Sequence, residues 1–530
     1  MKKRSNIKLT LDQGLAIVQD LQADLSSVAL ADILGVKRAY LLRRSVDARK
    51  KRDVHFVVTA GIGTGDDAPQ PVVSLEERPV PTCNTRGSRP IVVGTGPAGL
   101  FAALWLAEDG LRPIVIERGA PVDERTKDVE LFHRTRVLNT ASNVQFGEGG
   151  AGTFSDGKLT CGKNSPYTAR VLEAFVAAGA PSEILWQAKP HIGTDVLKGV
   201  VSRIRKRIIA CGGEVRFHTQ LIGMHFDSAG KCMGAQLHSA DGSEEFVAGT
   251  SLVLACGHSA RDTFSLLEQL GFELEQKPFS MGFRIEHEQQ FINHAQYGPA
   301  AGHPALGAAD YKMACHLDSG RSVYTFCMCP GGEVVAASSE DGALCVNGMS
   351  SQARDAANAN AAILCNVVPD DFGDLRDPLA GVALQRRWEN AAFSLGGGDW
   401  HAPAQRVGSF AESRSRSHHC PEPSYPLGVT EADLSNSLPP FAVGALRDAL
   451  PVLDRKLEGF ADSGALLTGI EARSSSPVRI VRDKATLMAT RFAGVYPCGE
   501  GAGYAGGIMS AAIDGIRVAE AIKQETANLE

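Results

Sequence analysis

Three glycines near residue 95 have the spacing of a phosphate-binding turn. Gly94, Gly96 and Gly99 form a GxGxxG pattern after the apolar run "IVV", an apolar helix is expected over 100–108, and a second strand, "PIVIE", ends at Glu117. In this pattern the first glycine permits a tight turn, the second lets the backbone approach a pyrophosphate and the third packs the helix on the strand. Because free N–H groups at a helix N-terminus favour anions, the stretch predicts a dinucleotide-binding site. Glu117 is expected to accept hydrogen bonds from ribose hydroxyls.

Two further stretches are too rich in glycine for a regular element. "FGEGGAGTFSDGKL", residues 146–159, holds five glycines. Glycine at this density is typical of close approach between a ligand and the backbone. Near the end of the chain, "AGVYPCGEGAGYAGGIMSAAIDGIRVAEAI" predicts a short strand, a glycine-rich turn containing Glu500, and a helix that begins near Gly507.

The composition is that of an ordinary globular protein. The chain has 530 residues, 44% hydrophobic and 22% charged, a net charge of −6 and a mean hydropathy of −0.08. Its length predicts about three domains, and its net charge argues against nucleic acid as an obligatory partner of the whole surface. The twelve cysteines include no CxxC pair, so we expect neither a zinc site nor a disulfide framework. With no apolar run long enough to span a bilayer, a cytoplasmic location is expected.

Residues 1–62 predict a small α+β unit with a ferredoxin-like fold. "NIKLTL", "RAYLLRR" and "VHFVVTAGI" are expected to be strands, and residues 12–23 a helix. Residues 37–52 contain eight basic residues and one acid, which indicates either an RNA-binding surface or a solvated charged face. Residues 63–90 are rich in Pro, Gly and polar residues and are predicted to be a linker.

The predicted fold class is α/β. It consists of a Rossmann-like nucleotide-binding domain, an inserted β-rich α+β substrate domain and the small N-terminal α+β unit. Residues 214–260 alternate in short β-rich runs that end at Ala255, Cys256 and Gly257, and residues 322–342 predict two strands around a Pro-Gly-Gly turn. The expected bounds are 1–80 for the N-terminal module and linker, 88–264 and 481–530 for the nucleotide domain, and 265–480 for the substrate domain.

The fingerprint, the Ala-x-Gly strand end and the late Gly-acid motif resemble the glutathione-reductase-like FAD superfamily. "RRSVDARKK", "FGEGGAGTFSDGKL", "GHSARDTF", "CMCPGGEVV", "SSSPVRI" and "YPCGEGAGYAGGIMSAAIDG" together resemble a largely uncharacterised family of bacterial and plastid FAD-dependent dehydrogenases. The resemblance implies FAD as cofactor. It places Glu500 near the ribityl chain or pyrophosphate, in a position where Asp is usual, and the helix N-terminus at residues 506–508 near the flavin pyrimidine.

A flavin performs its own redox chemistry while the protein positions and tunes it. We expect the stretch 146–159 to lie along the flavin, where the cation of Lys158 would stabilise its anionic reduced form. An exposed lysine or a partner of Asp156 is the alternative, and Glu148 has no assigned role. The predicted cofactor-binding residues are Gly94, Gly96, Pro97, Ala98, Gly99, Glu117, Arg118, Gly147, Gly149, Gly150, Gly152, Thr153, Asp156, Gly157, Lys158, Leu221, Ala255, Gly257, Gly499, Glu500, Gly506, Gly507 and Ile508.

Cys327 and Cys329 are candidate catalytic residues together with Lys158. Alternate residues of a strand share one face, so the two cysteines would line a cavity or form a redox pair. Five arginines could bind an anion on the substrate through their guanidinium groups. They are Arg284, Arg387, Arg406, Arg473 and Arg479. The histidines show no HExxH pattern, His418 and His419 are expected in a mobile loop, and no metal site is predicted.

The predicted function is that of an FAD-dependent dehydrogenase that takes a hydride or two electrons from a small-molecule substrate. Only one full dinucleotide fingerprint is present, so electrons would leave through O₂, a quinone, a protein electron carrier or a transiently bound nicotinamide, which would leave as NAD(P)H. The alternative is a flavin-containing RNA-binding or RNA-modifying protein anchored by residues 37–52. No membrane partner is expected.

Overall fold

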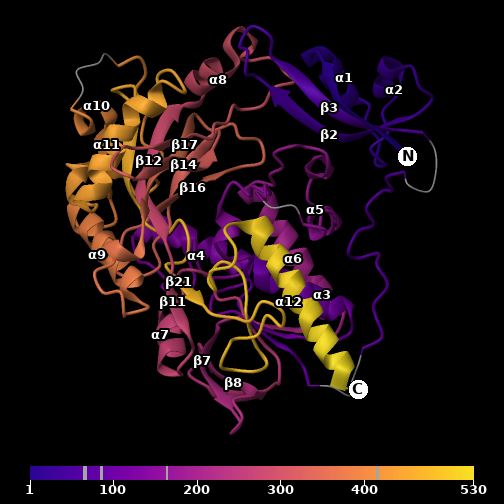
Figure 1. Cartoon of the computed structure of the whole chain (residues 1–530), viewed down its shortest axis with the longest axis vertical. Coiled ribbons are helices and arrows are strands. Elements are labelled where there is room, and N and C mark those ends of the chain that lie inside the picture. Colours follow the sequence, from indigo (N-terminus) through magenta and orange to yellow (C-terminus); the bar gives the residue numbers. More distant parts are fainter. Residues whose placement is uncertain (64–67, 84–87, 163–164, 413–416, 530) are drawn as a thin grey trace.

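The computed structural model describes residues 1–63, 68–83, 88–162, 165–412 and 417–529. Figure 1 shows a small N-terminal module in indigo at the upper right, a central region that holds α3 and α12, and a sheet region with the orange helices at the left. The predicted linker over 63–90 and the predicted loop around His418 each lie partly outside the described residues. Among the described residues, no helix is long and apolar enough to cross a membrane.

The N-terminal module is an α+β unit, as predicted, but its topology is not ferredoxin-like. A ferredoxin-like motif runs β-α-β-β-α-β, whereas here two consecutive helices precede the second strand and the three-stranded antiparallel sheet has the order β1-β3-β2. The second helix follows Ser27, whose hydroxyl caps its N-terminus, a signal that the sequence prediction missed. The elements are β1 (Lys2–Leu9), α1 (Leu11–Gln19), α2 (Val28–Leu34), β2 (Ala39–Asp47) and β3 (His55–Ile62).

A five-stranded parallel sheet forms the centre of the molecule. Its order is β22-β10-β4-β5-β6, so strands from three separate parts of the chain lie side by side. All residues of β4, β5, β10 and β22 are buried, as expected for parallel strands covered on both faces. This arrangement confirms the Rossmann-like sheet. The strands are β4 (Ile91–Val93), β5 (Ile114–Ile116), β6 (Glu214–Arg216), β10 (Leu252–Leu254) and β22 (Val495–Pro497).

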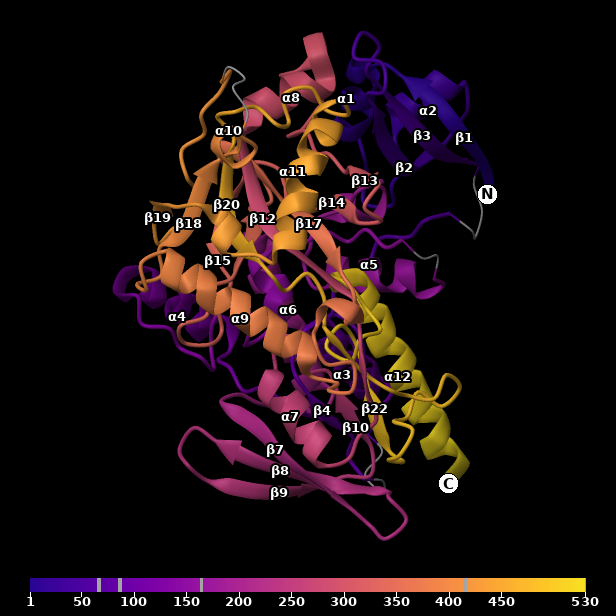
Figure 2. The ribbon, with the colours of Figure 1, turned by 60° about the vertical axis from the view of Figure 1, so that its left-hand side comes forward.

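Helices cover this sheet and pack against one another (Figure 2). α3 and α12 make an extensive contact, and Gly515 permits it because a Cβ there would lie 2.2 Å from the carbonyl oxygen of Ala98. An antiparallel sheet of β7, β8 and β9 and the helix α7 complete the region. The elements are α3 (Pro97–Glu108), α4 (Val122–Thr135), α5 (Tyr167–Ala177), α6 (Thr194–Ala210), β7 (Thr219–Phe226), β8 (Cys232–Ser239), β9 (Glu244–Ala248), α7 (Arg261–Gln269) and α12 (Ile508–Leu529).

The β-rich region that lies in the chain between β10 and β22 contains a seven-stranded sheet. Its order is β13-β14-β17-β12-β20-β18-β19, and its long central strands β12 and β17 are antiparallel, from Phe279 opposite Val367 to Glu288 opposite Asn358. The predicted strands around the Pro-Gly-Gly turn are β14 and β15, which belong to different sheets. The strands are β12 (Phe279–Glu288), β13 (Ala314–His316), β14 (Ser322–Cys329), β15 (Gly332–Ala336), β16 (Val346–Ser350), β17 (Asn358–Val367), β18 (Ala402–Arg406), β19 (Val429–Glu431) and β20 (Leu466–Glu471).

Helices pack on this sheet, and a two-stranded ribbon joins its region to the parallel sheet. Among the helices, α11 contacts β12, β13, β14 and β17, and α9 contacts β18 and β20. The predicted domain bounds stay predictions. The remaining elements are β11 (Leu274–Gln276), α8 (Gln289–Tyr297), α9 (Ala380–Leu395), α10 (Val407–Phe410), α11 (Pro440–Asp454) and β21 (Val478–Ile480), of which β11 and β21 form the antiparallel ribbon.

A buried carboxylate ties α7, α9 and the end of β20 together. Glu389 on α9 accepts two hydrogen bonds from Arg261, the first residue of α7, at 2.9 and 2.8 Å. It accepts two more from Arg473, both at 2.8 Å. Burial disfavours the charged carboxylate, yet the two guanidinium groups lower the pKa of Glu389 to about 2. A pair of bidentate ion pairs therefore joins the two sheet regions.

We predict that Glu389→Gln lowers the free energy of unfolding by about 3 to 5 kcal/mol, because it leaves two buried guanidinium groups without their anion. The folded-state pKa lies below the value of about 4.3 for an unfolded Glu, so this contribution is present above that value and is lost as the pH falls toward 2. Urea unfolding at pH 7 and pH 3 measures both effects. Glu431→Gln, at an exposed position on β19, is the control, and equal unfolding midpoints for the two variants would contradict the role of Glu389.

Candidate active site

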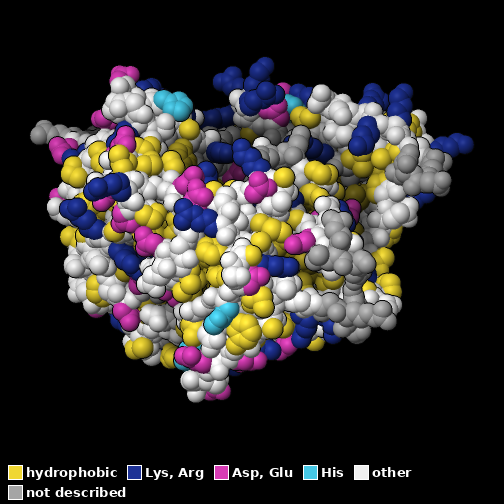
Figure 3. All heavy atoms as spheres, turned by 60° about the horizontal axis from the view of Figure 1, so that its bottom comes forward, with side chains coloured by type: hydrophobic (Ala, Val, Ile, Leu, Met, Phe, Trp, Pro, Cys, Tyr) yellow, Lys and Arg dark blue, Asp and Glu magenta, His cyan; other side chains and the backbone are white. Residues whose placement is uncertain are grey.

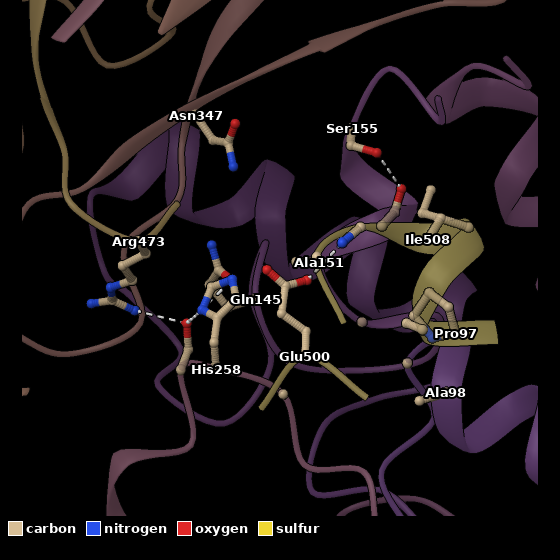
Figure 4. A pocket seen from close by; sticks show the side chains of 18 of the residues that line it. Pro97, Ala98, Gln145, Ala151, Ser155, His258, Asn347, Arg473, Glu500 and Ile508 are labelled. Carbon is tan, nitrogen blue, oxygen red and sulfur yellow. Dashed lines mark hydrogen bonds between the residues drawn. The ribbon is translucent and has the colours of Figure 1, made fainter. Parts of the chain in front are cut away.

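A cavity of about 650 Å³ lies where the parallel strands end. The residues that directly follow β4, β10 and β22, namely Gly94, Ala255 and Cys498, all line it. The carboxyl ends of strands are where open α/β sheets bind ligands. The seven-stranded sheet contributes the opposite wall. Figure 4 shows Pro97 and Ala98 on one side of this space and Asn347 and Arg473 on the other.

The three fingerprint glycines have different surroundings. Gly94 has φ +100°, and a Cβ there would lie 2.3 Å from the carbonyl oxygen of Ala255. A Cβ on Gly99 would lie 1.9 Å from the carbonyl oxygen of Gly94. At Gly96, the N-cap of α3, the nearest atom to an added Cβ is 4.0 Å away. Gly94 and Gly99 are thus required by the fold, whereas Gly96 leaves space for a ligand.

Glu117 accepts four hydrogen bonds from the loops around the cavity. Its Oε2 accepts from the backbone N–H and the hydroxyl of Thr95 at 2.9 and 2.7 Å. Its Oε1 accepts from the N–H groups of Gly119 and Gly147 at 3.0 and 3.1 Å. The carboxylate lines the cavity and holds three loops together. The ribose contact predicted for it stays a prediction.

The glycine-rich stretch is wrapped around the buried guanidinium of Arg125 on α4. Its side chain donates to the carbonyl oxygens of five residues, at distances from 2.7 to 3.2 Å. Arg125 is 0% exposed. Because these carbonyl oxygens all point toward the guanidinium group, the cation fixes the course of the loop backbone. The five acceptors are Asn143, Val144, Gly147, Glu148 and Gly150.

Most of the predicted cofactor-binding residues line this one cavity. Five are not among its lining residues, although each is adjacent in the chain to one that is: Gly99, Gly149, Thr153, Asp156 and Gly499. Those that line it are Gly94, Gly96, Pro97, Ala98, Glu117, Arg118, Gly147, Gly150, Gly152, Gly157, Lys158, Leu221, Ala255, Gly257, Glu500, Gly506, Gly507 and Ile508.

Two acids of the glycine-rich stretch have structural partners. Glu148 accepts a hydrogen bond from the backbone N–H of Val122 at 2.8 Å and pairs with Arg205 at 3.0 Å. Asp156 is 0% exposed and accepts two hydrogen bonds from Arg354, at 2.9 and 2.5 Å, and one from Ser350. Asp156 is not among the residues that line the cavity, and the cofactor contact predicted for it stays a prediction. Its hydrogen bonds with Ser350 and Arg354 fasten the glycine-rich stretch to the end of β16.

Lys158 lines the cavity with its side chain 28% exposed. Its ammonium nitrogen lies 3.9 Å from Asp156, beyond hydrogen-bond distance. The sequence also allowed Lys158 to be a partner of Asp156. In the structure their contact is long, because Arg354 already binds that carboxylate. Lys158 keeps its charge available to the cavity.

Cys327 lies in the cavity wall, and Cys329 lies behind it. An irregularity in the pairing of β14 with β17 falls between Phe326 and Cys329, and Cys327 has φ +41°, which is uncommon for a residue with a side chain. The alternation expected for a regular strand fails at this bulge. The thiol of Cys329 donates to the carbonyl oxygen of Cys327 at 3.2 Å.

One buried arginine connects this wall to a carboxyl group. Arg284 donates to Glu471 at 3.0 Å and to the carbonyl oxygen of Cys327 at 2.9 Å. Hydrogen bonding by the Cys329 side chain, with the charges of Lys158 and Arg284, lowers the pKa of Cys327 below the ordinary range of a cysteine thiol. Burial raises the pKa of Glu471, which also lines the cavity, to about 7. Two groups with strongly shifted pKa values thus lie in one cavity wall.

Glu500 lies at the glycine-rich turn before α12. Figure 4 shows its carboxyl group within the cavity, near Gln145 and His258. It accepts a hydrogen bond from the N–H of Gly507 at 3.2 Å, and burial raises its pKa to about 7. A Cβ on Gly506 or Gly507 would have no atom within 4 Å. The start of α12 therefore presents open backbone, as the sequence predicted.

Only one of the five arginines predicted to bind an anion lines the cavity, and this is Arg473. Its charge is matched by Glu389. The other four are not among the residues that line it, and the anion contact predicted for each stays a prediction. Arg284 pairs with Glu471, Arg387 lies over the ring of Trp388, Arg406 donates to the carbonyls of Pro421 and Gly464, and Arg479 lies 3.6 Å from Glu275.

Sequence reasoning missed several polar residues of the cavity, among them Gln145, His258, Lys312, Asn347 and Arg354. Two had a local signal, since His258 directly follows the Ala-Cys-Gly strand end and Gln145 directly precedes the glycine-rich stretch. Burial, followed by the charges of Arg473 and Arg261, lowers the pKa of His258 to about 3. Its imidazole is therefore neutral at pH 7. His418, expected in a mobile loop, is hydrogen-bonded to Asp462.

The basic run 37–52 lies on the N-terminal module, and most of its Lys and Arg side chains are exposed. Lys and Arg side chains stand out along the upper edge of the face in Figure 3, including its right-hand end, where this module lies in Figure 1. Arg44 is the exception, because it stacks between the rings of Phe56 and Trp186 at 4.5 and 4.9 Å. This contact docks the module beside the segment that leads into the cavity wall.

Comparison with known proteins identifies the family. Residues 278–474 match the family model described as FAD-dependent protein, C-terminal domain-like. An uncharacterised protein of Clostridium beijerinckii is 44% identical over 532 residues, which cover 98% of each chain. The chain belongs to the family of that protein. The match extends through every region described above, including the N-terminal module.

Solved structures with a similar arrangement share little sequence with this family member. A geranylgeranyl bacteriochlorophyll reductase-like protein of Thermoplasma acidophilum is 11% identical, with 83% of this chain and 79% of that chain covered and a TM-score of 0.36. The glycine oxidase of Bacillus cereus is also 11% identical, with 83% and 96% covered and a TM-score of 0.35. At these scores the likenesses leave the reaction of this family open.

The cofactor of this family member is FAD, and the chain is a flavoprotein oxidoreductase. The cavity fits the group in size, since ligand sites commonly measure about 300 to 1,000 Å³. It also fits in shape, because added Cβ atoms at Gly257, Gly506 and Gly507 would meet no protein atom within 4 Å. The residues that would hold FAD are the fingerprint loop for the pyrophosphate and the glycine-rich stretch with the start of α12 for the ring system.

We predict that Gly96→Val abolishes FAD binding while the protein stays folded. The fold has room for a side chain at this position, so the clash arises with the pyrophosphate alone. Flavin content per chain and the thermal unfolding midpoint of the apo form measure the two effects. A matched Gly99→Val variant should lose the fold itself, and a Gly96→Val protein that retains one FAD per chain would refute the placement.

Arg125→Lys should lower flavin content by at least tenfold. An ammonium group cannot reach five carbonyl oxygens in the plane of a guanidinium fork, so the glycine-rich stretch would lose its shape. The matched control is Arg134→Lys, an exposed position on the same helix. Absorbance of protein-bound flavin after dialysis is the readout, and equal flavin content in both variants would show that Arg125 does not shape the site.

Proposed function

We propose that the protein is an FAD-dependent dehydrogenase that oxidises a small organic substrate by removing a hydride and a proton. Bound FAD supplies the two-electron chemistry. The observation that supports the proposal is that one cavity unites the dinucleotide loop with a wall containing Cys327 and Glu471. Because oxidation of a C–H bond beside an O–H or N–H group releases a proton, that wall provides the acceptor.

Cys327 is the proton acceptor in this proposal. Hydrogen bonding by Cys329 and the charges of Lys158 and Arg284 hold the pKa of its thiol below the ordinary range of cysteine, and a general base is most effective when its pKa lies near the working pH. Arg284 orients both groups, since its guanidinium donates to Glu471 and to the backbone carbonyl of Cys327. Glu471, with a pKa of about 7, then takes the proton onward from the Cys327 sulfur.

The wall also limits access of water. Cys329 and Arg284 are 0% exposed behind it, and Asp156 joins it to the glycine-rich stretch through Arg354 and Ser350. Water is thereby excluded on the inner side of Cys327, which is itself partly exposed toward the cavity. The electron acceptor, whether a transiently bound nicotinamide (NAD(P)⁺, which would leave as NAD(P)H) or a protein carrier, stays a prediction, as does the RNA-binding alternative for the basic run.

An anaerobic screen of hydride-donating metabolites tests the proposal. At least one alcohol, amine or hydroxy acid should bleach the bound flavin, and Cys327→Ser should slow that bleaching by about 10² or more with unchanged flavin content. The wild-type rate should fall as the pH is lowered below neutrality, because protonation removes the base. Bleaching by NADH or NADPH with no bleaching by any of these donors would contradict the dehydrogenase direction, and a Cys327→Ser protein with the wild-type rate and pH profile would remove Cys327 from the mechanism.

A further inference from the structure

The end of the cavity opposite the fingerprint loop is built by segments that are distant in sequence. It contains residues 158–160, 189–190, 310–312 and 325–328, together with Arg354. These segments are linked to one another by contacts. Lys158 forms a backbone bridge with His191, and Lys189 pairs with Asp310 at 2.7 Å. The four segments therefore form one continuous wall, which we call the distal wall.

Cations outnumber carboxylates in the distal wall. Four basic side chains line it: Lys158, Lys189, Lys312 and Arg354. Arg354 is matched by Asp156, and Lys189 is matched by Asp310. Glu471 lies nearby, but its carboxyl group is hydrogen-bonded to the buried Arg284. Two positive charges thus have no carboxylate of their own.

The two unmatched cations are Lys158 and Lys312. Lys158 lies 3.9 Å from an Asp156 carboxylate already bound by Arg354. Lys312 forms no hydrogen bond or ion pair within the described part of the chain. Both lysines line the same cavity wall, Lys312 with an exposed side chain and Lys158 with its side chain 28% exposed. Two positive charges gathered in one cavity wall raise the local concentration of an anion, and this attraction weakens as salt is added.

Apolar side chains accompany these cations. Phe326 lines the cavity and is 38% exposed, and Met328 lies in the same wall. A large exposed aromatic side chain beside unmatched cations suits a ligand that has an apolar body and a charged end. Cys327, between these two apolar residues, would then face the apolar part of the ligand.

Resting on the dehydrogenase function proposed above, we propose that the distal wall binds an anionic group of the substrate, a carboxylate or a phosphate on an apolar body. Lys158 and Lys312 bind the oxyanion, and Phe326 and Met328 contact the apolar body. The substrate is thereby oriented with its oxidisable bond toward Cys327. Cationic amines without an acidic group are excluded, because they would meet the two surplus positive charges.

Titration of the FAD-loaded protein with matched probes tests this inference. Benzoate and phenyl phosphate are the anionic probes, benzamide is their neutral counterpart, and perturbation of the flavin absorbance reports binding. At least one anionic probe should bind ten times or more tighter than benzamide, and its advantage should shrink as salt is raised. Comparison of benzoate with phenyl phosphate distinguishes the two oxyanions.

A substitution that removes the charge of Lys312 tests whether the anionic probe binds at the distal wall. Lys312→Gln should weaken the anionic probe by about fivefold, leave benzamide binding unchanged and keep flavin content at the wild-type level. Lys37→Gln removes the same charge from the N-terminal module and should change nothing. Equal binding of all probes, or equal effects of the two variants, overturns the inference. A purified chain that cannot be loaded with FAD would instead overturn the proposed function.

Discussion

The shape of the cofactor site depends on the guanidinium of Arg125. This buried cation gathers five carbonyl oxygens of one loop, so the glycine-rich stretch is folded around a charge inside the protein. A loop with so many glycines has high conformational entropy when free. Fixing it in advance lowers the entropic cost of binding a cofactor, since the backbone is already ordered when the ligand arrives.

Ion pairs then connect this loop to the rest of the site. Asp156 in the glycine-rich stretch is hydrogen-bonded to Arg354, which follows the end of β16. Glu389 on α9 is hydrogen-bonded to Arg261 on α7 and to Arg473. Each is a buried anion with guanidinium partners, which is weak evidence for net stability but strong evidence for a defined arrangement in this chain. These ion pairs therefore link segments of the two sheet regions around the cavity.

Much of the cofactor site followed from the sequence because its signals are local. The strand–GxGxxG–helix unit and the glycine-rich turn before α12 each lie within about thirty residues, and backbone sterics restrict such turns to glycine. The distal wall could not be predicted from the sequence, because its basic residues are far apart in the chain and come together only in the folded structure. They are Lys158, Lys189, Lys312 and Arg354. The regular strand assumed for Cys327 and Cys329 also failed, since a bulge in β14 turns one sulfur to the cavity and leaves the other buried. The N-terminal module was misjudged for a related reason, because the second helix and the strand order depend on tertiary packing.

The central claim is that FAD lies between the glycine-rich stretch and the start of α12, with the distal wall left free for substrate. A crystal structure of the FAD-loaded protein tests it most directly. The account predicts density for the pyrophosphate at Gly96, for the ring system beside residues 150–152 and 506–508, and open space at Lys158 and Lys312. Density for the ring system against Lys312 and Phe326, or outside this cavity, would contradict it.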